Sequence, residues 1–315
     1  MNAMRLFAPA VLAIALVGCG QKVELSSVPA PGSYVVVTET QMSQKFHGGP
    51  ADGKSMDTQM TMHMRLDVGE ADASGRRDMT VTFERIRQQL VVEGRTTAYD
   101  SAKPDEGDEQ LARVLGALAG ASLRMTVDAD GKLVDAEGLD ALWDRLAEKH
   151  TRLSGVIGQM KAQLGDEAIG QMVVRQNRMM PDEPVGTGDT WTGTMTLKLP
   201  MIGEQNYRYR GRVTDIDHKA GRALATIAFE GVISSNEDGA VALPGAPTRV
   251  ELLGMEMTQS GTMLYDAQVD MATAVDMTQK GTVRMRITLP DGEPVEMTVE
   301  QEASTKMTAH RAVEP

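Results

Sequence analysis

Alternation of apolar and polar positions dominates the first third of the chain. Met60, Met62 and Met64 occupy every second position of a stretch in which polar residues stand between them. Successive side chains of a β-strand point to opposite faces, so this period of two predicts a strand with one apolar face. The same criterion predicts strands at 34–38, 56–68, 77–92 and 97–100.

The pattern changes over residues 105–178. Leu111, Leu115 and Leu118 recur at the three- and four-residue spacing of an amphipathic helix. Between two such stretches, residues 123–134 predict a hairpin that turns at Asp130-Gly131. Helices are predicted at 111–118, 139–146, 153–160 and 169–173.

Alternation returns after residue 190. Strands that follow one another through short links pair antiparallel, and one polar face implies contact with water. The predicted fold class is therefore α+β: a single domain at 33–310 with a large curved, half-barrel-like antiparallel sheet, and a helical insertion at 105–178 packed on or across it. The predicted strands of this part are 190–199, 207–216, 222–231, 250–259, 262–267, 269–277, 281–289 and 295–307.

The amino terminus has the layout of an export signal. A basic residue, Arg5, precedes an apolar run at 6–17, which is too short to cross a bilayer and contains Pro9. The run ends in Leu16-Val17-Gly18-Cys19, which resembles the lipobox of bacterial lipoproteins. That resemblance implies cleavage before Cys19, lipid on the thiol and acylation of the new amino terminus.

We therefore expect a signal peptide at 1–18 and a lipidated tether at 19–32. The tether is rich in serine and proline, as flexible or extended linkers are. The expected partner is a membrane of the bacterial cell envelope, reached through the lipid on Cys19, with the protein facing the periplasm. Gly20 stands where an aspartate would resemble an inner-membrane retention signal, which favours the outer membrane.

The amino-acid composition excludes several classes of function. The net charge of −12 and an aromatic content of 3% argue against binding to nucleic acid, which needs cations and stacking platforms. One cysteine and five scattered histidines predict neither a disulfide nor a metal site, and no cofactor is expected. Without a Gly-x-Ser-x-Gly motif or another nucleophile motif, we expect no catalytic residues and no enzyme activity.

One acidic segment begins like a calcium loop. Asp128-Ala-Asp130-Gly131 has the opening spacing of such a loop, whose twelfth position must be a bidentate glutamate. That position is Leu139, so the segment predicts a hairpin turn instead.

Methionine is unusually frequent, with 23 residues against 4 phenylalanines. Its flexible, polarizable side chain suits a concavity that accepts apolar molecules of varying shape, and it equally fills an ordinary core. Two interpretations therefore stay open: a lipoprotein that binds a lipid or another apolar molecule, and a structural or protein-interaction lipoprotein with a filled core. The candidate ligand-binding residues of the first are Met60, Met62, Met64, Met257, Met271, Met285 and Trp191.

A short motif carries a family resemblance. The segment 180–191 reads Met-Pro-Asp-Glu-Pro-Val-Gly-Thr-Gly-Asp-Thr-Trp. It resembles the Pro-x-x-Pro-Val-x-x-Gly-Asp-x-Trp stretch of uncharacterised bacterial lipoproteins grouped as a domain of unknown function, which implies no enzymatic activity. The combination of long strands, helices and a lipobox also resembles, at the level of the fold, envelope lipid carriers of the LolA and LppX types.

Overall fold

The computed structural model describes residues 22–26, 28–149, 151, 157–158, 161, 165–166, 179–199, 203–219, 221–235, 249–288 and 292–313. Cys19 and the predicted signal peptide lie outside this part of the chain. So do the predicted helix at 169–173 and most of the one at 153–160.

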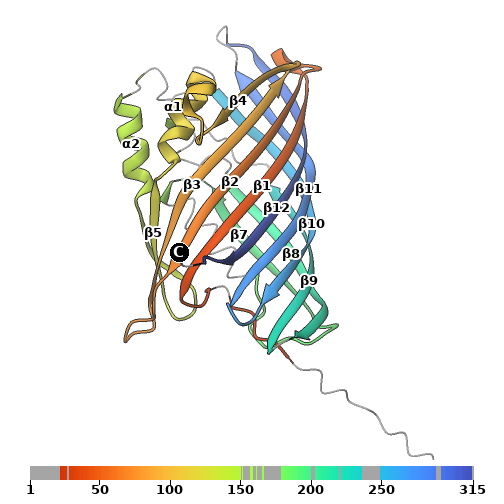
Figure 1. Cartoon of the computed structure of the whole chain (residues 1–315). Helices are drawn as coiled ribbons and strands as arrows, with labels where there is room; N and C mark the ends of the chain where they lie inside the picture. The colour runs from red at the N-terminus through yellow and green to blue at the C-terminus, as the bar shows by residue number, and fades with distance from the viewer. Residues whose placement is uncertain are drawn as a thin grey trace, which may run out of the picture.

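One antiparallel sheet of twelve strands organises the molecule (Figure 1). Its strands follow the order β6-β5-β3-β2-β1-β12-β11-β10-β9-β8-β7, and β4 pairs with β3 beside this path. The bounds are β1 Gly32–His47, β2 Ser55–Val68, β3 Arg77–Val92, β4 Arg95–Asp100, β5 Ser122–Val127, β6 Leu133–Glu137, β7 Thr190–Leu199, β8 Gly203–Lys219, β9 Arg222–Ser235, β10 Arg249–Asp266, β11 Met271–Thr288 and β12 Pro294–Arg311.

The sheet is strongly curved. Figure 1 shows β1–β3 in front and β7–β9 behind, so one face of the sheet is concave. The first and last strands are neighbours in its middle, because β1 pairs with both β2 and β12.

Two α-helices lie beside the sheet in the described residues, α1 (Glu109–Leu118) and α2 (Leu139–Lys149). The Asp108 carboxylate accepts a hydrogen bond from the Leu111 N–H at 3.0 Å, which satisfies a free donor at the start of α1. The helix then contacts β3 and β4. Two 3-10 turns, η1 (Gly49–Ala51) and η2 (Pro104–Glu106), complete these elements. No helix of the described chain is long and apolar enough to span a membrane.

The predicted α+β class is wrong, because the molecule is β-dominant. The helices at 111–118 and 139–146 are present, but they are short, and the hairpin between them belongs to the main sheet. Its strand β5 pairs with β3 and thereby extends the sheet. The expected helical layer is therefore small in the described chain.

The hairpin at 123–134 is confirmed as β5 and β6, and its turn shows why the calcium-like spacing occurs. The Asp128 carboxylate accepts the N–H groups of Asp130 at 3.0 Å and Lys132 at 2.8 Å. An aspartate that binds backbone two residues ahead stabilises a tight turn. Within the described residues, no group of three or more side chains is placed to hold a metal ion.

Three clusters of buried side chains lie on the concave side. The largest joins the helices to β3 and β5 and includes the fully buried Trp143. A second, around Val213 and Ile227, lies at the end of the sheet where β7 begins. The third is small and centres on Met195 and Tyr207.

Residues 22–26 and 28–31 follow an extended course across the same end of the sheet; we call them the strap. Val23 and Val185 exchange two backbone hydrogen bonds of 2.8 and 2.9 Å. Val23 and Leu25 are buried in the second cluster. The Ser26 N–H then donates to the Tyr265 hydroxyl at 2.8 Å.

The strap continues towards the opposite side of the curved sheet. The Ala30 N–H donates to the Val269 carbonyl at 2.9 Å, and the Arg77 guanidinium donates to the Pro29 carbonyl at 3.0 Å. Residues assigned to the tether from sequence are thus packed against the sheet as far as Val23. The strap reaches from the start of β7 to the start of β3.

Candidate functional site: the concave face of the sheet

A continuous row of side-chain positions runs across the concave face. Cross-strand register places Met60 opposite Thr40, Thr40 opposite Thr305, and Thr305 opposite Met277. The row continues from Met277 through Gly261, Phe229 and Gly211 to Trp191. Its ends pack on the first and second clusters, which assigns the whole row to the inner face.

The middle of this face is only partly covered. Ile86 and Ile227, at the two sides, are each 1% exposed. By contrast Met42, Met277 and Met307 are half-buried and belong to none of the clusters formed by the described residues. The described part of the concave face therefore carries flexible apolar side chains between two filled regions.

Polar groups among these methionines bind one another. The hydroxyls of Thr40 and Thr305 lie 3.3 Å apart. The Gln44 amide donates to the Gln301 side-chain oxygen at 3.0 Å. Ligand sites are typically apolar with a few placed polar groups, and this stretch has that composition.

Glycines on the inner face make room for rings of the adjacent strands. A Cβ on Gly211 would overlap the indole of Trp191, and one on Gly231 would overlap the phenol of Tyr207. Each ring therefore lies flat across the neighbouring strand and extends less far into the concavity. The full set pairs Gly193 with Tyr209, Gly211 with Trp191, Gly231 with Tyr207 and Gly261 with Phe229.

The methionines predicted as ligand-binding residues are distributed along this face. Met60, Met62, Met64 and Met271 are half-buried and pack against the first cluster. Met257 is 3% exposed, and its thioether lies over Gly281. Met285 is half-buried opposite Met297 of β12. The first four share one region, and Met257 and Met285 lie on β10 and β11 outside it.

Trp191 sits at the second position of β7. Its indole N–H donates to the Met179 carbonyl at 2.8 Å, and its half-buried ring packs on the second cluster. The ring thus has a structural role over Gly211, and the residue is half-buried. Sequence reasoning did not single out Met42 or Met307, although both follow the period of two.

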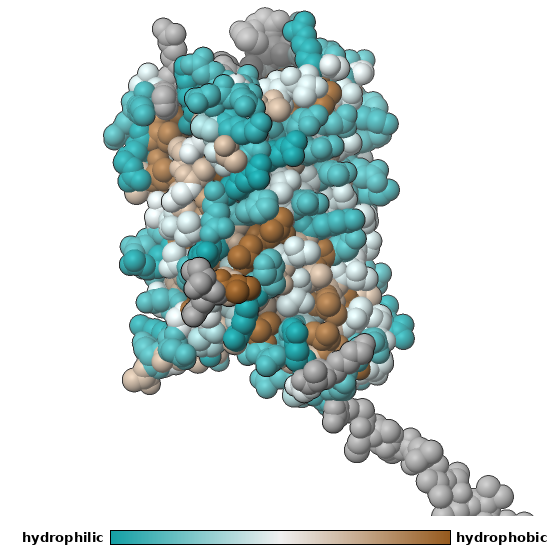
Figure 2. All heavy atoms as spheres, viewed as in Figure 1, coloured by the Kyte–Doolittle hydropathy of each residue, from teal (hydrophilic) through white to brown (hydrophobic). Residues whose placement is uncertain are grey.

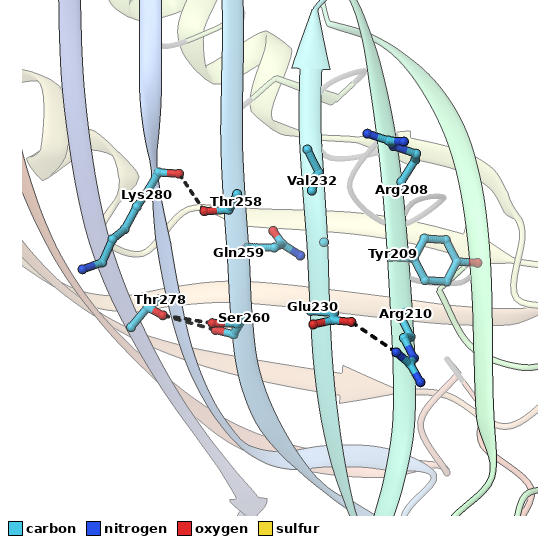
Figure 3. A pocket seen from close by; sticks show the side chains of 11 residues that line it. Arg208, Tyr209, Arg210, Glu230, Val232, Thr258, Gln259, Ser260, Thr278 and Lys280 are labelled. Carbon is cyan, nitrogen blue, oxygen red and sulfur yellow. Dashed lines mark hydrogen bonds and ion pairs between the residues drawn. The ribbon is translucent and has the colours of Figure 1, made fainter.

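The opposite, convex face carries a separate depression of about 550 Å³ across β8–β11 (Figure 3). Arg208 and Arg210 flank one side and Lys280 the other, with hydroxyl groups between them. Arg210 pairs with Glu230 at 3.8 Å. This shallow polar surface differs in chemistry from the concave face. Figure 2 shows that hydrophilic residues cover much of the surface in the view of Figure 1, with hydrophobic residues exposed between them near the middle.

Titratable groups with shifted pKa values lie away from the middle of the concave face. Burial raises the pKa of Tyr265 and of Asp270, both at the strap end. Beside them Asp266, which is fully buried, forms an ion pair with Arg222. At the opposite side of the sheet, hydrogen bonding to Arg85 lowers the pKa of Asp100 to about 2.

A pocket of about 420 Å³ adjoins the strap. Glu24, Asp128 and Asp270 contribute carboxylates to its lining, and Arg77 is the cation among them. The pocket is therefore mainly acidic.

A family model described as DUF6263, a family of unknown function, matches residues 74–285. The chain belongs to this family. The matched segment runs from the turn before β3 into β11, and so contains both helices and the motif at 180–191. Membership of a family of unknown function is thus confirmed, while the lipobox and lipid-carrier resemblances stay predictions. No curated protein matches the chain.

Several solved structures match the chain at low sequence identity. A lipovitellin structure, described for its lipid–protein interactions, is 8% identical with a TM-score of 0.47; the match covers 91% of this chain and 26% of that one. This chain thus spans about a quarter of that lipovitellin chain. The β domain of the Bordetella autotransporter BrkA is 7% identical with a TM-score of 0.25, covering 88% and 99%. The transport unit of AIDA-I from Escherichia coli is 5% identical with a TM-score of 0.28, covering 97% and 94%.

Proposed function

We propose that this protein is a lipid-anchored component of the bacterial cell envelope, without enzymatic activity, that binds a lipid or another apolar molecule on its concave face. The anchor is the lipid on Cys19, and the outer membrane is its proposed site. The observation that carries the binding proposal is the half-buried stretch around Met42, Met277 and Met307.

The chemistry of this stretch favours an apolar ligand. Burying apolar surface is favourable by about 25 cal/mol for each Å² removed from water. A ligand on the concave face would bury the partly exposed apolar surface there. Methionine adapts to varied apolar shapes because it is unbranched and polarizable. The flattened rings of Trp191 and Phe229 extend this surface towards β7.

The same stretch supports the non-enzymatic part of the proposal. An active site typically gathers titratable groups with perturbed pKa values in one cleft. The register row from Met60 to Trp191 is made of methionine, threonine, glycine and aromatic residues. The two aspartates with shifted pKa values lie at the margins of this row. Asp100 interacts with Arg85. Asp270 interacts with Tyr265 and Arg77.

A matched pair of variants tests ligand binding. Full-length Cys19→Ala protein is purified without detergent, its organic extract is examined by mass spectrometry, and cis-parinaric acid, a fluorescent fatty acid, is titrated into the stripped protein. Met277→Glu places a charge on the concave face, and Thr278→Glu places one on the exposed convex face of the same strand. We expect Met277→Glu to weaken probe binding about tenfold or more, since desolvating a charge is costly.

Thr278→Glu should bind the probe like the parent. A protein that neither carries an extractable apolar molecule nor binds the probe would instead fit a structural or protein-interaction lipoprotein. Equal effects of the two substitutions would place the probe away from the concave face.

A further inference from the structure

We infer that the strap end of the molecule is a membrane-facing surface, held next to the lipid headgroups by a very short connection. The inference rests on the proposed lipidation of Cys19. Lipidation alone does not say which surface of the domain faces the bilayer or how far the domain lies from the bilayer. The inference specifies both.

Chain length sets the distance. Val23 is fixed to the sheet by its two hydrogen bonds with Val185 and by its burial. A chain extends at most about 3.3–3.6 Å per residue, so the four steps from Cys19 to Val23 span at most about 14 Å. A free linker across all of 19–32 would allow roughly three times that reach by the same measure. The strap therefore removes most of the freedom that the sequence alone suggested.

The geometry of the strap decides which surface lies closest. Its contacts with Val185, Tyr265, Val269 and Arg77 all belong to one end of the sheet. The turn at 69–76 between β2 and β3 lies at this end, whereas Lys54, just before β2, lies at the other. Fourteen residues of β2 separate the two, roughly 45 Å along the strand.

Charge decides how this surface meets the bilayer. Acidic side chains at the strap end, among them Glu24 and Asp72, lie beside the mainly acidic pocket, and the exposed cations Lys22, Arg76 and Lys132 lie among them. Lys132 pairs with Asp130 at 3.3 Å. This mixture of charges offers no polybasic patch to an anionic leaflet, and charges at a surface act over about one Debye length, near 8 Å at physiological salt. The acyl chains alone would hold the strap end near the headgroups, with no electrostatic adhesion.

The position of the strap also separates the bilayer from the concave face. Val23 and Leu25 fill the second cluster and Val28 packs on the first, so the strap occupies the membrane-facing end of the interior. An apolar ligand would therefore reach the half-buried methionines from another direction than straight out of the leaflet.

Fluorescence quenching from the membrane measures this arrangement. Cys19 is the only cysteine of the chain, and its thiol is blocked when lipidated, so an introduced cysteine can be labelled selectively. Ala73→Cys places a bimane at the strap end and Lys54→Cys places one at the far end, both at exposed positions. The lipidated proteins are reconstituted into phosphatidylcholine vesicles with and without headgroup spin-labelled lipid.

We expect the label at position 73 to lose at least half of its fluorescence and the label at position 54 to lose little. A ten-residue Gly/Ser insertion between Gln21 and Lys22 should reduce quenching at position 73 while the protein still floats with vesicles. Equal quenching at both positions, or stronger quenching at position 54, would overturn the inference. Failure of the parent protein to float, or flotation of Cys19→Ala, would instead overturn the proposed anchor.

Discussion

At the scale of single residues, glycine acts here as a packing partner for aromatic rings. Gly193, Gly211, Gly231 and Gly261 lie within strands, where glycine is usually unfavourable because it adds flexibility and no packing area. Rings from the neighbouring strands cover these positions and supply the missing contact. This arrangement explains how the sheet face remains continuous with few aromatic residues.

The ring over Gly211 makes a sharp test of this arrangement. Gly211→Ala should destabilise the protein by about 1–3 kcal/mol, because the added methyl group would overlap Trp191. Gly254→Ala is the matched control, since a methyl group there would meet only the flexible end of Arg284. Urea unfolding measures both. Combining Gly211→Ala with Trp191→Leu should cost less than the sum of the two single changes.

Asp270 is a residue whose ionisation opposes folding. Burial raises its pKa above the ordinary value of 3.8, the carboxylates of Glu24 and Asp266 act in the same direction, and Arg77 and Tyr265 oppose the shift in part. A carboxyl that is harder to ionise in the folded state reduces stability as the pH rises from its ordinary pKa through its raised one. Below the ordinary pKa both states are protonated and the penalty disappears.

Asp270→Asn should therefore modestly stabilise the protein at pH 7 and have no such effect near pH 3. Asparagine also accepts the left-handed backbone of this position, where φ is 52°. Thermal unfolding at the two pH values measures the difference. A loss of stability at pH 7 would show that the contacts with Arg77 and Tyr265 outweigh burial.

At the scale of elements, the strap changes from a linker into part of the fold. Leu25→Ala should lower the free energy of unfolding by about 2–4 kcal/mol, because the side chain is 6% exposed in the second cluster. Urea unfolding of the Cys19→Ala protein would measure this loss. Lys22→Ala, at an exposed strap position, is the control and should have little effect. A free tether would show no difference between the two.

Strand positions were well predicted and strand lengths were not. Period-two alternation located β2 and β3 within a residue of their observed ends. The sequence predicts two strands at 250–259 and 262–267, but β10 continues through the two residues between them. A Cβ on Gly261 would overlap the Asp276 carbonyl and the Phe229 ring. One on Gly281 would overlap the Glu256 carbonyl and Met257. The need for glycine at such a position depends on the strand beside it, which a single stretch of sequence does not show.

The candidate site was predictable to a similar degree. Shared faces of methionine followed directly from alternation, as Met60, Met62 and Met64 show. Which methionines are covered depends on where α1, α2 and the strap pack, and sequence spacing does not encode this. The fold class failed for a related reason, because the predicted helical insertion contributes two strands to the main sheet.

At the scale of the whole molecule, the pairing of β1 with β12 joins two sets of strands. The strands β2 to β6 lie on one side of this pair, and β7 to β11 lie on the other. Ending the chain at residue 293 removes β12 and leaves an unpaired edge on both β1 and β11. Unpaired edges template aggregation, so this truncated protein should be insoluble or unfolded by circular dichroism. Ending the chain at residue 311 removes no strand residue and should leave the protein soluble.

The same pairing has a consequence for how the protein matures. Tyr34 pairs with Arg311, residues that lie almost at opposite ends of the chain. If the chain is exported amino terminus first, β1 crosses the membrane early and finds its partner only when the last strand has followed. Contacts between distant parts of a chain form slowly and leave strand edges exposed in the meantime. The edge of β1 that pairs with β12 would therefore stay unpaired until the last strand is available.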